Sequence, residues 1–391
     1  MDALPHADEL TAALSGLAAW WLSPGPSRDA AVAVVSGSTG WPFPHAAEAV
    51  RRAFSPYTPR TIAGIVRAGG GPGPRPGYLL AILAGRVPAV AANAVIRSLA
   101  ARVPVVLKPS SAEPEFARLL VASVRAVAPV IAPRVALLDL PSSDPRLAQA
   151  VRDAPACLAY GSDASVAAVV ALRPGLPTLV GAHRESFVLA FADALRDGSA
   201  ARRLATAVAD DVAIYDQSGC LSPHYALVEL GGLPPHAFAA LLRDEMARAA
   251  LRVLPAPPSI AEVAGVRMFV EECRALGGLV LPGPAGIPPA VVLLPPGAPA
   301  RPGPGLRVVQ VLPFEGEPDP DALLPRLAGR VQGVAVAGDR SRAHPRAAAA
   351  FAAHPAHRPC RACAPGRLQR PPASWPENGV VIERALSGFR P

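Results

Sequence analysis

The amino-acid sequence predicts an α/β protein built on a doubly wound parallel sheet, with a second α/β unit after it. Short apolar runs bounded by turn residues alternate with helical patterns between Leu79 and Val180. A similar alternation of apolar runs and helical patterns resumes after the residue pattern changes near Phe191. Hydrophobic residues make up 51% of the 391 positions and charged residues 17%, which supplies two buried cores and excludes a largely disordered chain.

The first 70 residues precede the alternating region and follow a different pattern. Helical spacing of apolar residues predicts helices at Ala7–Leu22 and Ala46–Phe54, and the short apolar run Ala31–Val35 predicts a strand between them. A Gly/Pro-rich hinge at 69–77 follows. We expect residues 1–70 to pack on the domain that comes next.

Residues 71–192 are expected to form that domain, a Rossmann-type sheet with helices on both faces. Its buried strands are predicted at Leu79–Leu83, Val103–Leu107, Val135–Leu140, Cys157–Tyr160 and Thr178–Val180. Its helices are predicted at Val90–Ala100, Pro114–Ala128, Asp144–Arg152 and Ser165–Ala171. Ser110 or Ser111 is the capping candidate for the helix that begins at Pro114. Sheets of this kind bind ligands, commonly nucleotides, at the carboxyl ends of their strands.

Residues 193–340 are expected to form the second α/β domain, and residues 341–391 to return to the first. Strands are predicted at Tyr225–Leu230, Ala290–Leu294, Val308–Leu312 and Val334–Val336. Helices are predicted at Ala200–Val208, Pro235–Leu251, Ile260–Leu276 and Pro320–Ala328. The apolar run Phe187–Phe191 closes the first alternating region, and the Pro/Gly-rich stretch 282–305 is expected to cover the surface.

The formal net charge of +8 raises the question of a nucleic-acid partner. The arginines are scattered singly and lack interleaved aromatic side chains, so the charge better fits an anionic small ligand or an acidic carrier protein. Of the 38 basic residues, 37 are Arg and one is Lys108. Lys108 is either a lysine retained by chance in an arginine-rich sequence or a compact positive charge that a ribose or phosphate contact requires.

The sequence predicts a cytoplasmic protein without an integral membrane segment. No run of about eighteen uncharged apolar residues is present. Asp2, Asp8 and Glu9 precede the first apolar stretch, where a signal peptide would be basic. Five cysteines, an odd number in no regular framework, argue against a disulfide-stapled secreted fold and leave at least one thiol for chemistry.

Cys220 is the candidate nucleophile. It lies in the polar segment Gln217-Ser-Gly-Cys-Leu-Ser-Pro-His224, where Gly219 lets the backbone approach a substrate carbonyl and nearby N–H groups can serve as oxyanion donors. His224 is a candidate base, although four residues across a proline do not establish contact with the thiol. The alternatives are an ordinary buried cysteine and a surface histidine.

Lys108 and the pair Gly161 and Ser162 are the candidate ligand-binding residues of the first domain. Lys108 ends a predicted buried strand, where ligands bind in open α/β sheets. Ser162 follows another strand and can cap the next helix, whose positive end would then face a phosphate. We expect the two motifs at adjacent strand ends. The alternatives are a surface cation and a common Gly-Ser turn.

A third group, His354, His357, Cys360 and Cys363, has zinc-like spacing. Prolines interrupt the span, so we interpret these residues as incidental, with a structural zinc as the alternative. The sequence predicts no catalytic metal.

Four segments follow one another in an order that resembles the aldehyde dehydrogenase superfamily, most closely the LuxC-like fatty acyl-CoA reductases of bacterial luminescence. They are Lys108-Pro-Ser-Ser, Tyr160-Gly-Ser-Asp, Gly181-Ala-His-Arg-Glu-Ser and Gln217-Ser-Gly-Cys-Leu-Ser-Pro. Gly85-Arg-Val-Pro and the late Pro365-Gly-Arg-Leu-Gln-Arg-Pro-Pro and Trp375-Pro-Glu-Asn-Gly segments also resemble that group. The resemblance covers roughly residues 75 to 385 and implies an aldehyde dehydrogenase-like fold.

The resemblance implies that Cys220 is the catalytic nucleophile, which takes the acyl group of a thioester and releases it as aldehyde after reduction by NADPH. Lys108 falls where the family's lysine contacts the adenosine ribose or its phosphate, with Ser110 and Ser111 beside it. Gly161 and Ser162 fall on the turn near the pyrophosphate. Ser111 stands where NAD-preferring relatives commonly have a carboxylate, which favours NADPH.

Two positions depart from the superfamily pattern. Gly181, or a neighbour, stands where aldehyde-oxidising relatives have a Glu that activates water, so hydrolysis of the acyl-enzyme is expected to be slow. Arg86 stands where the family usually has an Asn that donates to the oxyanion, and a misplaced donor there costs about 10²–10³ in rate. His224 and Arg86 are therefore supporting candidates only.

The function predicted from the sequence is NADPH-dependent reduction of a long-chain acyl-CoA or acyl carrier protein thioester to the aldehyde. The alternatives are an aldehyde-oxidising dehydrogenase of the same fold and a degenerate, non-catalytic partner subunit. We expect no nucleic-acid partner, and either a homo-oligomer or a complex with an acyl-activating enzyme.

Overall fold

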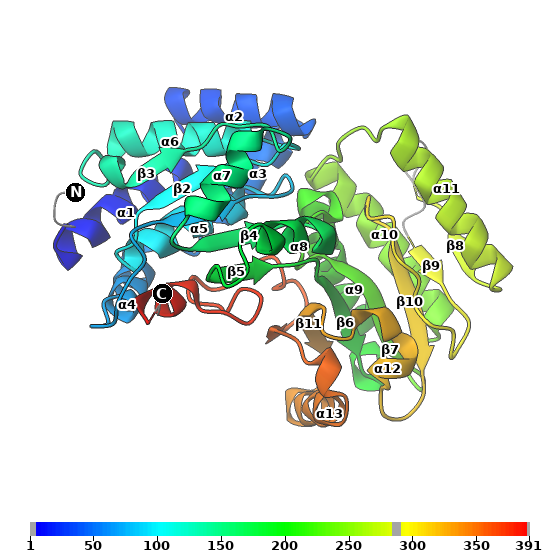
Figure 1. Cartoon of the computed structure of the whole chain (residues 1–391). Coiled ribbons are helices and arrows are strands. Elements are labelled where there is room, and N and C mark those ends of the chain that lie inside the picture. The colour runs from blue at the N-terminus through cyan, green and yellow to red at the C-terminus, as the bar shows by residue number, and fades with distance from the viewer. Residues whose placement is uncertain (1–4, 284–290, 389–391) are drawn as a thin grey trace. The chain divides into compact units, whose positions relative to one another are not determined.

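The computed structural model describes residues 5–283 and 291–388, and it forms two compact units (Figure 1). Of the described residues, the first unit contains 5–183 and 371–388, and the second contains 184–283 and 291–370. These divisions differ from the expected boundaries at 192/193 and 340/341. The boundaries affect β6 (Glu185–Ala190), expected in the first domain, and α13 (Arg340–Ala353), expected in the C-terminal segment. Both belong to the second unit, because β6 pairs there with β11 (Val331–Ala337), the strand that precedes α13.

The first unit is built on a five-stranded parallel sheet in the order β3-β2-β1-β4-β5. Its strands are β1 (Leu79–Ile82), β2 (Val105–Lys108), β3 (Val135–Leu137), β4 (Cys157–Tyr160) and β5 (Thr178–Gly181). The chain runs outward from β1 to β3 and then crosses to the other side of β1, which is a doubly wound topology with its switch point between β1 and β4. The predicted fold class is confirmed for this unit.

The helices that connect these strands are α5 (Pro88–Ala100), α6 (Glu115–Val127), α7 (Pro145–Asp153) and α8 (Asp163–Leu172). The predicted cap of α8 is confirmed, because the Ser162 side chain accepts a hydrogen bond from Ser165 N. The predicted cap of α6 is wrong. Glu113, instead of Ser110 or Ser111, accepts from Phe116 N at 2.9 Å, while Ser110 Oγ accepts from Ala112 N.

The N-terminal region is wholly helical in its described part, so the predicted strand at Ala31–Val35 is wrong. Its helices are α1 (Ala7–Leu22), α2 (Pro26–Thr39), α3 (Phe43–Phe54) and α4 (Pro59–Gly69). In α2 the buried positions include Ala31, Val32 and Val35, which recur at helical spacing. Pro26 at the first turn and left-handed Gly40 at the end complete the helix signals.

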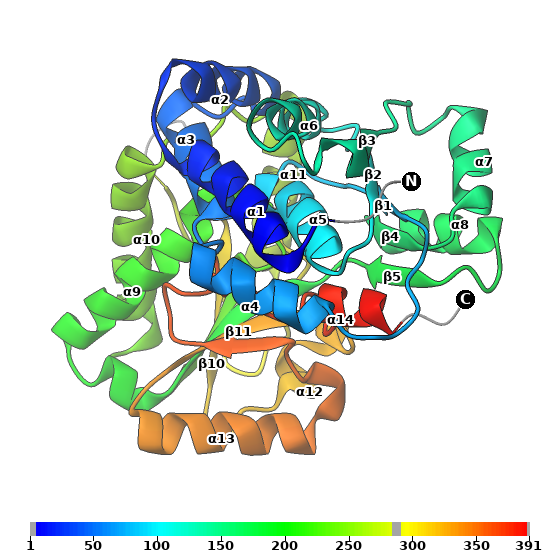
Figure 2. The ribbon, with the colours of Figure 1, turned by 90° about the vertical axis from the view of Figure 1, so that its left-hand side faces the viewer.

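Residues 371–388 return to the first unit through a buried ion pair. Arg97 of α5 donates from Nε to Glu383 of α14 (Ile382–Ser387) at 2.7 Å and from Nη1 to the carbonyl of Trp375 at 3.0 Å. The two charged side chains are 0% and 1% exposed. Figure 2 places α14 beside α4 and α5. Separating the two side chains would leave each charge buried without its partner, which is strongly destabilising. The pair therefore holds the C-terminal segment against α5.

The second unit is built on a seven-stranded sheet in the order β12-β11-β6-β7-β10-β9-β8. Besides β6, its strands are β7 (Pro223–Glu229), β8 (Leu279–Leu281), β9 (Val291–Leu293), β10 (Val309–Phe314), β11 (Val331–Ala337) and β12 (Arg361–Cys363). All pairings are parallel except β8 with β9. One apolar core lies under α9 (Gly198–Ala213) and α10 (Pro235–Arg252), and the other lies under α11 (Ile260–Ala275) and α13.

One predicted helix of the second unit is shorter in the structure, and one predicted strand is described only in part. The helix expected at Pro320–Ala328 is a short α12 (Pro320–Leu323) and a 3₁₀ turn at Pro325–Leu327, because Pro325 cannot continue the first helix. The strand expected from Ala290 is described from Val291 onward, and Ala290 itself lies outside the described residues. The short edge strand β8 and the helix α13 of this unit, and α14 of the first unit, were not predicted. None of the helices in the described ranges has the length and apolar character needed to cross a membrane.

Candidate active site

Cys220 lies on the surface of the second unit, in the loop between α9 and β7. Its Sγ atom is 3.5 Å from Nε2 of Gln332 on β11, and its carbonyl accepts a hydrogen bond of 2.8 Å from Ser186 Oγ on β6. Two buried strand residues therefore hold the backbone and the sulfur of one exposed cysteine.

The other four cysteines are poor nucleophiles. Burial raises the pKa of Cys157 to about 12 and those of Cys273 and Cys363 to about 11, and it also raises the pKa of Cys360. A thiol must ionise to attack, so the raised pKa makes each of these groups a weaker candidate nucleophile than an exposed thiol. Of the five, Cys220 is the exposed one.

A run of three left-handed residues turns the chain toward Cys220. Tyr215, Asp216 and Gln217 have φ values of 60°, 49° and 64°. For residues other than Gly this conformation costs about 1–2 kcal/mol each, so it persists only where the surroundings impose it. Strain of this kind concentrates at functional sites.

Buried polar contacts impose the turn. Asp216 accepts from Nε of Arg307 at 2.8 Å and from Ala256 N at 3.0 Å, and both charged side chains are 5% exposed. Gln217 donates from Nε2 to the carbonyls of Pro223 and Val308, each at 2.9 Å. The left-handed turn is thus held on both sides by partners that the sequence analysis did not identify.

The Pro365-Gly-Arg-Leu-Gln-Arg segment braces the same loop. Asp211 of α9 accepts from the backbone N–H groups of Leu368 and Gln369, each at 3.2 Å. The Gln369 side chain then donates from Nε2 to Ser222 Oγ at 2.5 Å. A Cβ at Gly219 would lie 3.1 Å from that same Nε2, so a larger residue before Cys220 would require the Gln369 amide to shift. Two of the segments that carried the resemblance are therefore neighbours.

His224 lies at the start of β7, beside the loop that leads to β10. A Cβ at Gly303 would come within 3.3 Å of its Nδ1 atom. The ring is therefore packed against that loop. Its role as a base remains a prediction.

Lys108 ends β2 and is 2% exposed. Its Nζ donates to Ser142 Oγ at 2.8 Å, and Ser142 Oγ lies 2.9 Å from Ser111 Oγ. Burial lowers the pKa of Lys108, and the carboxylate of Asp139 partly opposes that shift. Asp139 accepts two bonds of 2.9 Å from Arg118. The carboxyl end of β2 therefore holds a buried ammonium beneath the exposed hydroxyls of Ser111 and Ser142, with the ion pair of Asp139 and Arg118 near it.

The nearest carboxylate after Lys108 along the chain faces inward. Glu113 is 6% exposed and accepts from Ser38 Oγ at 2.8 Å as well as from Phe116 N. Burial raises its pKa. Glu113 is thereby committed to the interior of the first unit, while Ser111 is exposed.

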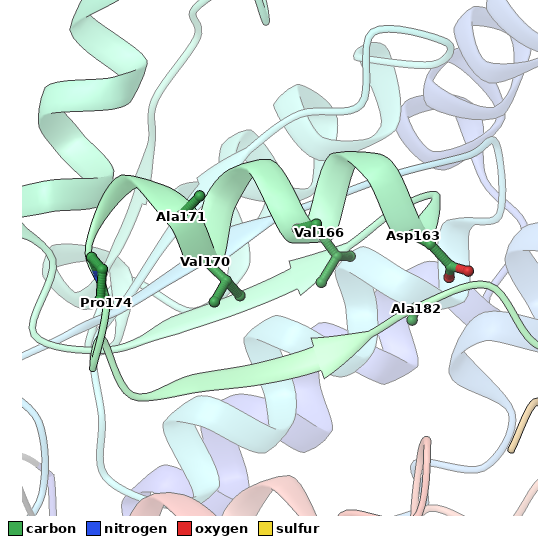
Figure 3. Close-up of a pocket in the computed structure, with 7 residues that line it drawn as sticks. Asp163, Val166, Val170, Ala171, Pro174 and Ala182 are labelled. Atoms are coloured by element: carbon green, nitrogen blue, oxygen red, sulfur yellow. The ribbon is translucent and has the colours of Figure 1, made fainter.

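Gly161 and Ser162 follow β4, and β1 lies between that strand and β2. The expectation of adjacent strand ends is therefore wrong by one strand, because the doubly wound order places β4 on the far side of β1. A groove of about 500 Å³ runs along α8 from Asp163 to Pro174, with Ala182 on its other side (Figure 3). Its lining is apolar apart from Asp163, so the groove offers no nucleophile.

Arg86 follows β1 and is half-buried. Its Nη1 donates to the carbonyl of Thr39 at 3.3 Å, and the residue lines a small cavity together with Ser110 and Glu113. At least one guanidinium nitrogen is thus tied to the end of α2.

Gly181 ends β5 against the ring of Tyr160. A Cβ at this position would lie 2.4 Å from Cδ1 of Tyr160, a distance that no real side chain tolerates. A glutamate at position 181 would therefore require that the Tyr160 ring move.

The zinc-like group does not assemble into one ligand set within the described part of the chain. His354 Nδ1 lies 2.8 Å from Asp321, and the buried His357 shares a 2.8 Å hydrogen bond between Nε2 and the Leu324 carbonyl. Cys360 Sγ instead faces Arg184 Nη1 at 3.5 Å. Over the residues described, the one group with metal-ligand geometry is Asp319, Asp321 and His354, which is largely exposed and lies apart from the two candidate cysteines of the motif.

Comparison with known proteins gives a family and a fold. The family model "Acyl-CoA reductase (LuxC)" matches residues 74–278, more than half of the chain. No curated protein matches the sequence. Among solved structures, similar ones include a salicylaldehyde dehydrogenase from Pseudomonas putida G7, with 18% identity, coverage of 92% of this chain and 81% of that one, and a TM-score of 0.62.

Two further structures extend the fold likeness. An NAD-dependent aldehyde dehydrogenase from Sinorhizobium meliloti is 18% identical, with coverage of 92% of this chain and 74% of that chain and a TM-score of 0.70. A succinic semialdehyde dehydrogenase from Streptococcus pyogenes, solved with NADP+, is 13% identical, with coverage of 92% and 82% and a TM-score of 0.67. At these identities the likeness establishes an aldehyde dehydrogenase-like fold of two α/β domains.

Proposed function

The chain belongs to the LuxC family of acyl-CoA reductases, and from that membership we propose that it reduces an acyl thioester to an aldehyde through an acyl group held on Cys220. Family membership supports an oxidoreductase of the aldehyde/acyl couple. The observation that carries the finer proposal is the position of Cys220, an exposed thiol on a strained loop that buried side chains hold in place.

The first step exchanges one thioester for another. The Cys220 thiolate attacks the acyl carbon, an S–C bond to Sγ forms, and the bond to the thiol of coenzyme A or of a carrier protein breaks, with the electron pair leaving on that sulfur. We assign the stabilisation of the oxyanion to backbone N–H groups of the loop other than those of Ser218 and Ser222, which donate to the carbonyls of Tyr215 and Gly219. No oxidation occurs in this step.

The second step reduces the acyl-enzyme to the aldehyde. NADPH, when bound, would supply the hydride that the acyl carbon takes up; the S–C bond of the acyl-enzyme then breaks, with the electron pair returning to Sγ of Cys220. The donor set at the edge of the first unit fits such a cofactor, because Lys108, Ser111 and Ser142 offer an ammonium and hydroxyls to a ribose phosphate. Gly161 and Ser162 directly precede α8, whose positive end suits a pyrophosphate, although Asp163 adds a carboxylate to its first turn.

The rival functions have less support. An aldehyde oxidiser needs a base that activates water. The ring of Tyr160 fills the space beside Gly181 that the side chain of a glutamate at that position would occupy. A non-catalytic partner subunit is favoured by Arg86, whose guanidinium is tied to Thr39. That account gives no reason why buried side chains hold the Cys220 loop in place.

The test of the reaction is acyl transfer without reductant. The protein is incubated with a radiolabelled long-chain acyl-CoA and, in parallel, with the same acyl group on an acyl carrier protein. We expect a labelled band that hydroxylamine removes, and label recovered as aldehyde when NADPH is added. Label that never attaches from either donor would favour the partner-subunit account, and label recovered as free acid would favour hydrolysis.

Cofactor choice is a separate prediction. The 2′-phosphate of NADPH can pair with Lys108 while Ser111 donates a hydrogen bond, and charge-assisted bonds of this kind contribute about 1.5–3 kcal/mol each. Since about 1.4 kcal/mol corresponds to one decade, we expect NADPH to exceed NADH at least about tenfold in kcat/KM. Lys108→Ala should remove most of that preference, and Ser111→Glu should shift it toward NADH.

Steady-state kinetics with both cofactors measure this preference. Glu113→Gln is the control, because that carboxylate faces Ser38 and the backbone of α6 and should not affect the choice. An equal or better rate with NADH in the unmodified protein would contradict the assignment of Lys108.

A further inference from the structure

Gln332 is a buried polar residue at an irregular point of β11. The pairing of β11 with β6 shifts register between Val331 and Gly333, so Gln332 is the extra residue of a β-bulge. Its side chain is completely buried. Bulges re-aim side chains and occur preferentially beside active sites.

The side-chain amide of Gln332 has a sulfur atom as its hydrogen-bond partner. Nε2 of Gln332 lies 3.5 Å from Sγ of Cys220, within hydrogen-bonding distance for sulfur. Oε1 is buried and has no hydrogen-bond partner within the described residues. A buried amide that leaves its oxygen unpaired weakens the fold, and an apolar side chain of the same length would avoid that cost.

A second buried glutamine of the same sheet has the arrangement expected of a structural residue. Gln310 of β10 accepts from Arg301 N at 2.9 Å and donates to the Arg301 carbonyl at 2.7 Å. Both ends of that amide are satisfied by backbone. Gln332 differs in that its one hydrogen bond within the described chain goes to the candidate nucleophile.

We propose that Gln332 is a catalytic residue whose buried amide donates a hydrogen bond to Sγ of Cys220 and stabilises the thiolate that attacks the acyl thioester. A hydrogen bond to the ionised form of a group favours that form. The fixed bulge also holds Sγ in one rotamer, so the attacking sulfur is oriented as well as ionised. The acyl-transfer role rests on the proposed function, whereas the effect on the thiolate does not.

Two substitutions separate the contact from the packing. Gln332→Met has nearly the same length and no donor, and it also removes the unpaired oxygen. Gln332→Asn keeps the amide but is one methylene shorter, which withdraws the donor by about 1.5 Å. The matched control is Gln310→Met, which removes an amide from the same sheet without touching Cys220.

The measurement is the rate at which iodoacetamide alkylates Cys220 as a function of pH, followed on the Cys220 peptide by mass spectrometry. For Gln332→Met and Gln332→Asn we expect the pKa of Cys220 to rise by about one unit, and alkylation below that pKa to slow by about tenfold. Gln310→Met should leave the alkylation profile unchanged while lowering the midpoint of thermal unfolding.

Stability distinguishes this role from a structural one. If Gln332 acts on sulfur, Gln332→Met should unfold at the same or a higher temperature while its thiol is less reactive, since an apolar isostere replaces a half-satisfied amide. An unchanged alkylation profile in both Gln332 variants would overturn the proposal, and so would a profile that shifts equally in Gln310→Met.

The experiments test the proposed function separately from the contact between Gln332 and Cys220. If alkylation slows in the Gln332 variants but labelled acyl-CoA never attaches to the unmodified protein, the thiolate contact is real and the thioester chemistry is wrong. If acylation proceeds equally fast in the unmodified protein and in both variants, Gln332 has no catalytic role and the reductase assignment is unaffected.

Discussion

Cys220→Ala is expected to abolish both acylation and aldehyde formation, with a loss of about 10³-fold or more in kcat/KM, because no other group can form the covalent intermediate. The substitution removes one exposed sulfur and leaves the loop's backbone contacts to Ser186 in place. The protein should therefore remain folded. Radiolabel transfer from acyl-CoA and NADPH-dependent aldehyde release measure the two steps.

Cys157→Ala is the control for that experiment. Cys157 is fully buried in β4 of the first unit, and burial raises the pKa of its thiol to about 12. Its replacement should cost some stability and leave acylation intact. If Cys157→Ala eliminates activity while Cys220→Ala retains it, the assignment of the nucleophile is wrong.

Asp216→Ala is expected to lower the free energy of unfolding by about 3–5 kcal/mol, because it leaves the Arg307 guanidinium buried without its carboxylate. Both Asp216 and Arg307 also have left-handed backbone, with φ values of 49° and 60°. Without the ion pair the strained turn can relax, and Cys220 should lose its fixed position. Urea unfolding and iodoacetamide alkylation of Cys220 measure the two effects.

Asp210→Ala is the matched control for Asp216→Ala. Asp210 accepts from Arg252 at 2.6 Å, but both side chains are about half exposed, and pairs of this kind contribute at most about 1 kcal/mol. The double variant Asp216→Ala with Arg307→Met should recover part of the lost stability, because the unpaired charge is gone. Equal losses from Asp210→Ala and Asp216→Ala would contradict the account of the turn.

The sequence predicts the central sheet of the first unit well, and the reason is physical. Strands that are buried on both faces appear as short continuous apolar runs between turn residues, and β4 has the predicted bounds. The same criterion fails for Ala31–Val35, because a short apolar run is compatible with a strand or with one face of a helix. Pro26 and Gly40, which bracket α2, are the signals that could have decided it.

The residues of the candidate site were also predicted only in part. The sequence identifies Cys220 and Lys108 because each is an unusual residue in a recognisable place. It misses Ser142, which reaches Lys108 only through the loop after β3, and Asp216 and Arg307, which lie far apart along the chain. Gln332 carries a local signal in retrospect, since a polar residue next to a glycine inside an apolar strand is typical of a bulge.

The ion pair between Arg97 and Glu383 joins residues that are 286 positions apart, with the whole second unit encoded between them. During synthesis the first unit therefore cannot be completed when its own sheet has emerged. At translation rates of about 5–20 residues per second, Arg97 waits about 15 to 60 s for its carboxylate. Over that interval the buried surface of α5 lacks its C-terminal partner, which makes the insertion of the second unit a matter of timing as well as of architecture.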